Sequence, residues 1–139
     1  MAIESVPSIG IGSASKQGWV LVIAREQRLR QLLLAVLGRA GYALLGYATL
    51  AEAQQALVQR DYPRLILFDG DEASEARLRE QIHQIKASLP PGTNCRVIVF
   101  SLAHPQPRLQ ELPGVDALIA RPFDLMHVLD KVEALMQAH

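Results

Sequence analysis

Short apolar runs alternate with helical patterns along residues 18–139. The run Trp19–Ile23 is continuous and rich in β-branched side chains, which is typical of a strand buried on both faces. Four further apolar runs follow, and each is separated from the next by enough residues for a helix. The predicted strands span 19–23, 43–45, 65–68, 97–100 and 117–120.

Between these runs, apolar side chains recur three and four residues apart, as they do along one face of a helix. Thr49 and Glu52 form the S/T-x-x-E capping signature, and Asp124 is well placed to cap the last helix. The proline-containing stretch 104–112 allows at most a short helix. The predicted apolar faces consist of Leu29, Leu32, Leu33, Val36 and Leu37; Leu50, Ala53, Ala56 and Leu57; Leu78, Ile82, Ile85 and Leu89; and Leu125, Val128, Leu129, Val132, Leu135 and Met136.

This alternation of strands and helices predicts parallel strand pairing with right-handed crossovers. The expected fold is therefore α/β, a three-layer sandwich around a five-stranded parallel sheet. In such sheets, ligands and chemistry gather at the carboxyl ends of the strands. The residues at or just after those ends include Ala24, Arg25, Asp69, Ser101 and Arg121.

Composition narrows the class of protein. Half of the 139 residues are hydrophobic, and 14 Lys and Arg balance 14 Asp and Glu. This balance provides neither the basic surface that nucleic-acid binding requires nor a polybasic membrane patch. The single cysteine, Cys95, fits a reducing compartment, and no apolar run has the length of a membrane span, so we expect a cytoplasmic location. Residues 1–17 are rich in Ser and Gly, and we expect them to be a flexible leader before one domain at 18–139.

The strand ends do not offer familiar enzyme chemistry. No glycine occurs at 24–27 after the first strand, which argues against a dinucleotide-binding loop. No arrangement of Ser, His and Asp, or of Cys and His, suggests a hydrolase. We therefore expect a protein that is not an enzyme.

Three segments and their spacing carry a family resemblance. They are 63–69 (PRLILFD), 97–101 (VIVFS) and 120–123 (ARPF), and Gly41-Tyr42 after the first helix agrees with them. The stretch 18–139 resembles the receiver domain of bacterial response regulators. The resemblance implies a flavodoxin-like fold with strand order 2-1-3-4-5 and a role in phosphorelay (two-component) signal transduction.

The resemblance also implies a role for each residue at the strand ends. Asp69 matches the aspartate that accepts a phosphoryl group from a histidine kinase, and Ser101 matches the hydroxyl residue that hydrogen-bonds this group. An alternative for Ser101 is a backbone hydrogen bond at the end of its strand. Arg121 stands where the family has Lys, and Ala24 and Arg25 stand where the family has two acidic residues that hold Mg²⁺.

These departures change the charge of the site. Phosphoryl transfer depends on positioning and on neutralisation of charge by Mg²⁺, which usually takes one or two carboxylate ligands. The matched positions hold Asp69, Arg25 and Arg121, a net charge of +1, so we expect no metal and no other cofactor. Arg25 is either a counter-ion of Asp69 or an exposed loop residue, whereas Arg121 is expected to point into the pocket and hold Asp69.

Other positions of the expected pocket also depart from the family pattern. Leu102 stands where a small residue leaves room for the phosphoryl group, and Leu118 stands where an aromatic side chain reports phosphorylation by rotating. Glu26 and Asp71 are either solvated carboxylates or, together with Asp69, the ligands of an unusual Mg²⁺ site.

The sequence therefore predicts a pseudo-receiver with impaired Mg²⁺-dependent aspartyl phosphorylation that acts as a protein-interaction module. Its partner would be a kinase, an output domain or another regulator. By resemblance, the contact face is formed by the fourth helix, the fifth strand and the fifth helix, and this face also allows a homodimer. One alternative is a phosphorylatable receiver with Asp69 as acceptor and a non-standard metal site. An alternative from another class is a sensor whose positive pocket binds a small phosphate- or carboxylate-bearing ligand.

Overall fold

The structure, a computed structural model, describes residues 18–58, 61–70, 74–101, 107–121 and 123–137. The predicted leader at 1–17 lies outside the described residues. In the part of the chain that is described, no helix has both the length and the apolar character that a membrane crossing requires.

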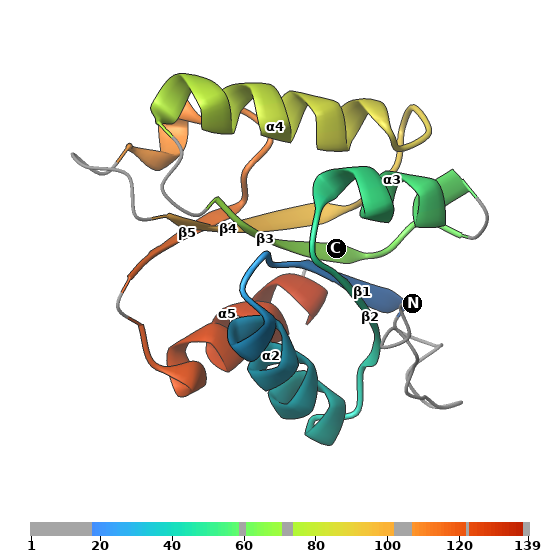
Figure 1. The fold of residues 1–139 in the computed structure, drawn as a ribbon, viewed down its shortest axis with the longest axis vertical. Helices are drawn as coiled ribbons and strands as arrows, with labels where there is room; N and C mark the ends of the chain where they lie inside the picture. The colour runs from blue at the N-terminus through green and yellow to red at the C-terminus, as the bar shows by residue number, and fades with distance from the viewer. Residues whose placement is uncertain (1–17, 59–60, 71–73, 102–106, 122, 138–139) are drawn as a thin grey trace.

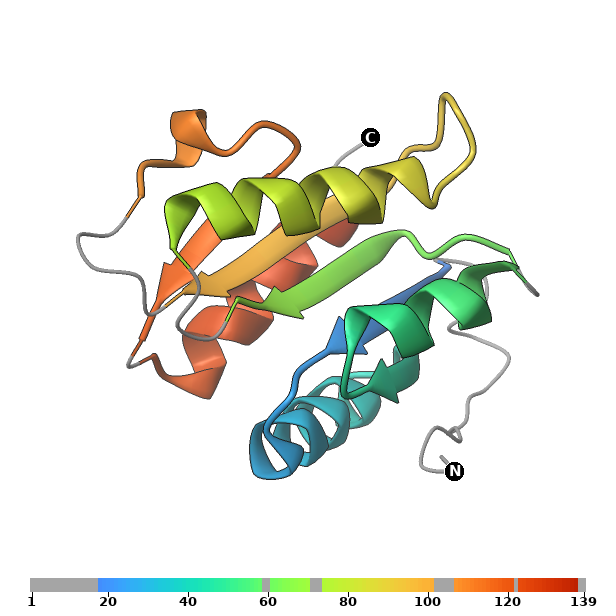
Figure 2. The ribbon, with the colours of Figure 1, turned by 45° about the horizontal axis from the view of Figure 1, so that its top comes forward.

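The strands of the described chain form one parallel sheet in the order β2-β1-β3-β4-β5. Figure 2 shows the arrowheads of the strands pointing the same way, so their carboxyl ends share one edge. The predicted strands and their order are confirmed, although β2 continues to Tyr47 rather than ending at residue 45. The strands are β1 (Trp19–Ile23), β2 (Ala43–Tyr47), β3 (Leu65–Asp69), β4 (Arg96–Ser101) and β5 (Ala117–Ala120).

Helices lie on both faces of the sheet and complete a three-layer α/β sandwich (Figure 1). α3 and α4 cover one face, and α2 and α5 cover the other. The predicted fold class is therefore confirmed. The helices are α2 (Gln27–Arg39), α3 (Leu50–Val58), α4 (Glu75–Ala87) and α5 (Leu125–Gln137).

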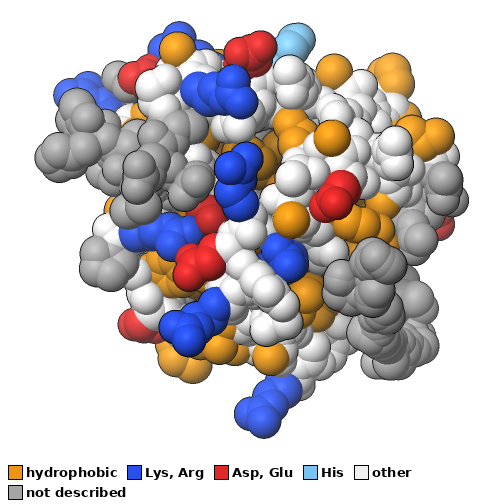
Figure 3. All heavy atoms as spheres, in the orientation of Figure 1, with side chains coloured by type: hydrophobic (Ala, Val, Ile, Leu, Met, Phe, Trp, Pro, Cys, Tyr) orange, Lys and Arg blue, Asp and Glu red, His pale blue; other side chains and the backbone are white. Residues whose placement is uncertain are grey.

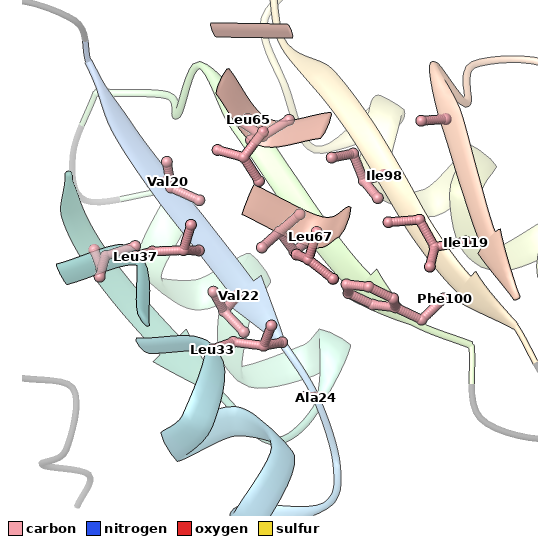
Figure 4. Close-up of a cluster of buried hydrophobic side chains, with 14 of the residues drawn as sticks. Val20, Val22, Ala24, Leu33, Leu37, Leu65, Leu67, Ile98, Phe100 and Ile119 are labelled. Carbon is pink, nitrogen blue, oxygen red and sulfur yellow. The ribbon is translucent and has the colours of Figure 1, made fainter. Parts of the chain in front are cut away.

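A large cluster of buried apolar side chains lies between the sheet and the α2 and α5 layer (Figure 4). Val22, Leu67 and Phe100 of neighbouring strands are fully buried in it. The second cluster lies on the α3 and α4 side, where Ile66 and Ile82 are buried. Because β3 is buried along its whole length, its last residue, Asp69, is held at a fixed position.

The apolar face of α2 is narrower than the sequence predicts. Leu29, Leu33 and Leu37 are buried, whereas Leu32 is 45% exposed and Val36 is only partly buried. The four-residue spacing keeps the three buried leucines in one stripe, and Leu32 lies about 100° around the helix from Leu33. The prediction that Leu32 belongs to the core is therefore wrong.

The predicted capping signature ahead of α3 is confirmed. The Thr49 hydroxyl accepts a hydrogen bond from the Glu52 amide at 3.2 Å. The Glu52 carboxylate accepts one from the Ala48 amide, also at 3.2 Å. This return bond lies one residue earlier than in the usual capping box, and it fixes the loop between β2 and α3.

Two further side chains cap helix N-termini. Asp124 accepts a hydrogen bond from the His127 amide at 2.9 Å, as predicted for the start of α5. Ser74 accepts one from the Arg77 amide at 3.3 Å, a cap of α4 that the sequence analysis missed. Each cap satisfies an amide that the helix itself leaves without an acceptor.

The connection between β4 and β5 contains a short 3-10 helix, η2 (Leu109–Glu111), in the part of 104–112 that the structure describes. Residues 102–106 lie outside the described part. Leu112 follows η2 and is buried in the cluster on the α4 side. This arrangement agrees with the prediction of at most a short helix here.

Candidate functional site

Three of the predicted site residues end neighbouring strands. Asp69 is the last residue of β3, Ser101 is the last residue of β4, and Arg121 directly follows β5. Asp69 is in register with Phe100, and Ser101 with Ala120. The parallel sheet therefore brings Asp69, Ser101 and Arg121 together at the carboxyl ends of its strands.

A buried ion pair joins Asp69 to Arg121. Arg121 Nη2 lies 2.7 Å from Asp69 Oδ2, and the Asp69 side chain is only 2% exposed. On its other side, Arg121 Nη1 lies 3.9 Å from Glu26 Oε1, although the Glu26 side chain is 60% exposed. One guanidinium thus lies between two carboxylates, one buried and one open to solvent.

Aromatic packing holds the segment that carries Arg121. Phe123 stacks on Phe100 of β4, with ring centroids 4.9 Å apart. The guanidinium carbon of Arg121 lies 5.9 Å from the centroid of Phe123, within the range of a cation–π contact. The Arg121 amide donates to the Ser101 carbonyl at 3.4 Å. These contacts aim the Arg121 side chain back across the strand ends toward Asp69.

The two residues that follow β1, Ala24 and Arg25, differ in burial. Ala24 is buried in the core, and its carbonyl accepts a hydrogen bond from Arg30 Nη1 at 2.8 Å. Arg25 is exposed and forms no ion pair with any described residue. Of the two interpretations of Arg25, the structure supports an exposed loop residue, and the counter-ion of Asp69 is Arg121 instead.

Ser101 and Leu118 are both part of the interior. Ser101 is fully buried and has an interaction partner. Leu118 is partly buried against the cluster on the α4 side, so an aliphatic side chain occupies this position of β5. Asp71 and Leu102 lie outside the described residues.

Gly70 packs closely beside Asp69, and this was not predicted from the sequence. Its amide donates to the Phe100 carbonyl at 2.7 Å. A Cβ atom here would overlap Leu78 Cδ2 and lie 3.1 Å from the Phe100 carbonyl oxygen. A larger residue at position 70 would therefore require the buried Leu78 side chain to shift, and the glycine directly after Asp69 was the available signal.

The described residues do not suit Mg²⁺. Mg²⁺ requires oxygen ligands in near-octahedral geometry, and two positions that would supply carboxylates hold Ala24 and Arg25. No group of three acidic, His or Cys side chains in the described part of the chain could hold a metal ion. One Asp69 oxygen already faces a guanidinium at 2.7 Å, where a dication would meet like charge.

Cys95 does not provide a reactive group. It is buried and free of any disulfide. Burial raises the pKa of the Cys95 thiol to about 12, with a lowering contribution from Lys86 and a raising one from Asp116. The thiol therefore stays protonated near neutral pH, which agrees with a packing role.

Comparison with solved structures assigns the fold to a class. A response regulator from Thermotoga maritima superimposes with a TM-score of 0.70 and 18% identity, over 87% of this chain and 98% of that chain. A CheY-like receiver domain from Methanospirillum hungatei gives 0.68 and 17%, over 86% and 94%. An orphan response regulator of H. pylori gives 0.66 and 20%, over 89% and 98%.

No protein-family profile and no curated protein matches the sequence. The structural likeness is therefore the evidence for the class. The chain has the fold of response-regulator receiver domains, and the predicted resemblance is confirmed at this level.

Proposed function

We propose that this chain is an atypical receiver domain that acts in two-component signalling through contacts with a protein partner, without Mg²⁺-dependent phosphorylation of Asp69. The observation that carries the proposal is the 2.7 Å pair between Arg121 and a carboxylate that is 2% exposed. The receiver fold supports the signalling role, and the residues at the strand ends support the loss of the chemistry.

Two features of the site oppose phosphorylation: the ion pair between Arg121 and Asp69, and the loss of the carboxylates that would bind Mg²⁺. At an effective dielectric constant near 20, unit charges 2.7 Å apart attract by about 6 kcal/mol before desolvation is deducted. A phosphoryl donor that approaches Asp69 Oδ2 would have to displace this guanidinium. The donor would also lack the metal charge on which phosphoryl transfer depends.

Phosphorylation by acetyl phosphate with Mg²⁺, followed by intact mass, tests this proposal. We expect no phosphorylated wild-type chain. The variant A24D/R25D/R121K restores the family pattern, so we expect it to gain phosphorylation that Asp69→Asn removes. Circular dichroism checks that the variants are folded. Mg²⁺-dependent, near-complete phosphorylation of the wild-type chain would contradict the proposal.

For the partner, we propose a second copy of this chain at the face that includes β5. In the chain, η2 precedes β5 and α5 follows it, and each carries a large exposed hydrophobic residue. Leu109 of η2 is 40% exposed, and Met126 of α5 is 64% exposed. β5 is also an edge strand of the sheet. An exposed strand edge and exposed apolar side chains favour association.

Sedimentation velocity over a range of protein concentrations tests this homodimer. We expect Met126→Lys to shift the chain toward monomer, because a charge replaces an apolar contact. Leu32→Lys on α2 is the matched control, since Leu32 is a similarly exposed hydrophobic residue on another helix. A chain that stays monomeric, or a dimer that only Leu32→Lys disrupts, would rule out this face.

A further inference from the structure

The helix α2 carries positive charge and no acidic residue. It contains Arg28, Arg30 and Arg39 but neither Asp nor Glu, whereas the whole chain has 14 basic and 14 acidic residues. Near the bottom of Figure 3, side chains coloured as Lys and Arg lie over α2 as Figure 1 places it. α2 is therefore a positively charged helix on a protein whose formal net charge is zero.

Two of these arginines share one exposed stripe of α2 with a leucine. Positions 28, 32, 35 and 39 are separated by four, three and four residues, so they lie within about 60° of one another around the helix. We call Arg28, Leu32, Ala35 and Arg39 the α2 stripe, and all four are exposed. At 1.5 Å per residue, Arg28 and Arg39 lie about 16 Å apart along the axis, with apolar residues between them.

The described residues do not neutralise the two arginines of the α2 stripe. Neither Arg28 nor Arg39 forms an ion pair with a residue that the structure describes. Asp130 and Glu133 belong to α5, the other helix on this face of the sheet, and neither pairs with an arginine of the stripe. Both guanidinium groups are therefore available to an external carboxylate.

Acidic residues outside the described part of the chain do not belong to this helix layer or are balanced. Asp71 and Glu72 come between β3 and α4 in the chain, and α4 covers the face of the sheet opposite to α2. Residues 1–17 contain one acidic residue, Glu4, and one basic residue, Lys16. The positive charge of α2 is therefore local to that helix.

An exposed leucine between two unpaired arginines fits an acidic amphipathic helix of another protein. Opposite charges at the two ends set the register, and apolar contacts between them exclude water. Ala35 and the exposed Gly38 are small, so a partner helix can approach α2 closely. A membrane surface fits less well, because amphipathic membrane helices insert their apolar face, and that of α2 is buried against the sheet.

We propose that the α2 stripe binds an acidic amphipathic helix of a protein partner. Carboxylates of that helix lie against Arg28 and Arg39, and its apolar side chains lie against Leu32. The surface is separate from the face that includes β5, so this inference does not depend on the proposed homodimer. It does not depend on the proposed loss of phosphorylation either.

Fluorescence anisotropy of a labelled helical peptide, titrated with the full chain, tests this surface. The peptide is based on alanine and carries two glutamates eleven residues apart, with two leucines between them on the same face. The control peptide has the same composition, with the glutamates and leucines on opposite faces. We expect the first peptide to bind about tenfold more tightly than the control, and added salt to weaken its binding.

Substitutions in the α2 stripe should weaken the binding of the first peptide. Joint substitution of Arg28→Glu and Arg39→Glu should weaken it by about tenfold or more, because like charges then face each other. Leu32→Ala should weaken it about threefold through loss of apolar contact. Arg77→Glu is the matched control, because Arg77 is an exposed arginine of α4 and forms no ion pair with a described residue. Thermal melts check that every variant is folded.

Three results would overturn the proposal. The first is the absence of peptide binding at millimolar concentration, or equal binding of the two peptides. The second is an affinity that the joint substitution leaves unchanged, or that Arg77→Glu lowers equally. The third is self-association of the wild-type chain, measured by sedimentation velocity, that the joint substitution abolishes, because the α2 stripe would then bind a second copy of this chain.

Discussion

At the scale of single residues, the identity of Arg121 decides what the strand ends can do. A lysine would present one compact ammonium group, whereas the planar guanidinium carries several donors in a fixed fork. Here that fork lies 2.7 Å from Asp69 and 3.9 Å from Glu26. The Arg121 Nε atom is buried and has no hydrogen-bond partner among the described residues. The contact with Asp69 is therefore the shortest ion pair that the Arg121 side chain makes there.

Removal of Arg121 should destabilise the fold strongly, because it leaves a buried carboxylate without its counter-ion. We expect Arg121→Ala to lower the free energy of unfolding by about 3–5 kcal/mol, measured by urea denaturation. In the Asp69→Asn background the same substitution should cost much less. A loss of under about 1 kcal/mol, with no coupling to Asp69, would show that the pair behaves like a surface salt bridge.

At the scale of elements, α2 shows how burial differs between adjacent leucines. Leu33 is 1% exposed and packs against the sheet, whereas Leu32 is 45% exposed. Both are leucine in the same turn of the same helix, so their intrinsic helix propensities are equal. Any difference in their contribution to stability must come from packing.

Alanine substitutions at these two positions form a matched pair. We expect Leu33→Ala to lower the free energy of unfolding by about 2–5 kcal/mol, because it removes buried methyl groups and leaves a cavity. Leu32→Ala should cost less than about 1 kcal/mol. Urea unfolding of both variants measures the difference, and similar losses at the two sites would contradict the orientation of α2.

At the scale of the whole molecule, the sheet was predictable because strands buried on both faces leave continuous apolar runs in the sequence. The run at 65–68 predicts β3, and β3 carries Asp69 to the end of the sheet where the carboxyl ends of the strands lie. The sequence did not decide which arginine pairs with Asp69, because Arg25 and Arg121 both follow strands at that end. The choice depends on the stacking of Phe123 on Phe100, a tertiary contact.

A cleft at the carboxyl ends of β1 and β3, lined among others by Arg77 and Gln81, could not be predicted from the sequence. Arg77 and Gln81 lie one turn apart on α4, a spacing that is ordinary for exposed helix positions. Their shared environment arises only when α3 and α4 pack side by side and leave the end of β3 open between them. The position of the cleft therefore depends on how separate helices pack, which the pattern of hydrophobic residues along the sequence does not show.

The central claim is that Asp69 is held by Arg121 and does not bind Mg²⁺ and a phosphoryl group. A thermal melt with Mg²⁺ and beryllofluoride, a mimic of the phosphoryl group on aspartate, tests it most directly. We predict a midpoint equal to that of the protein alone. Binding at a hundred times the dissociation constant would add about 2.7 kcal/mol and raise the midpoint by about 5–15 °C. Such a rise, abolished by Asp69→Asn, would contradict the claim.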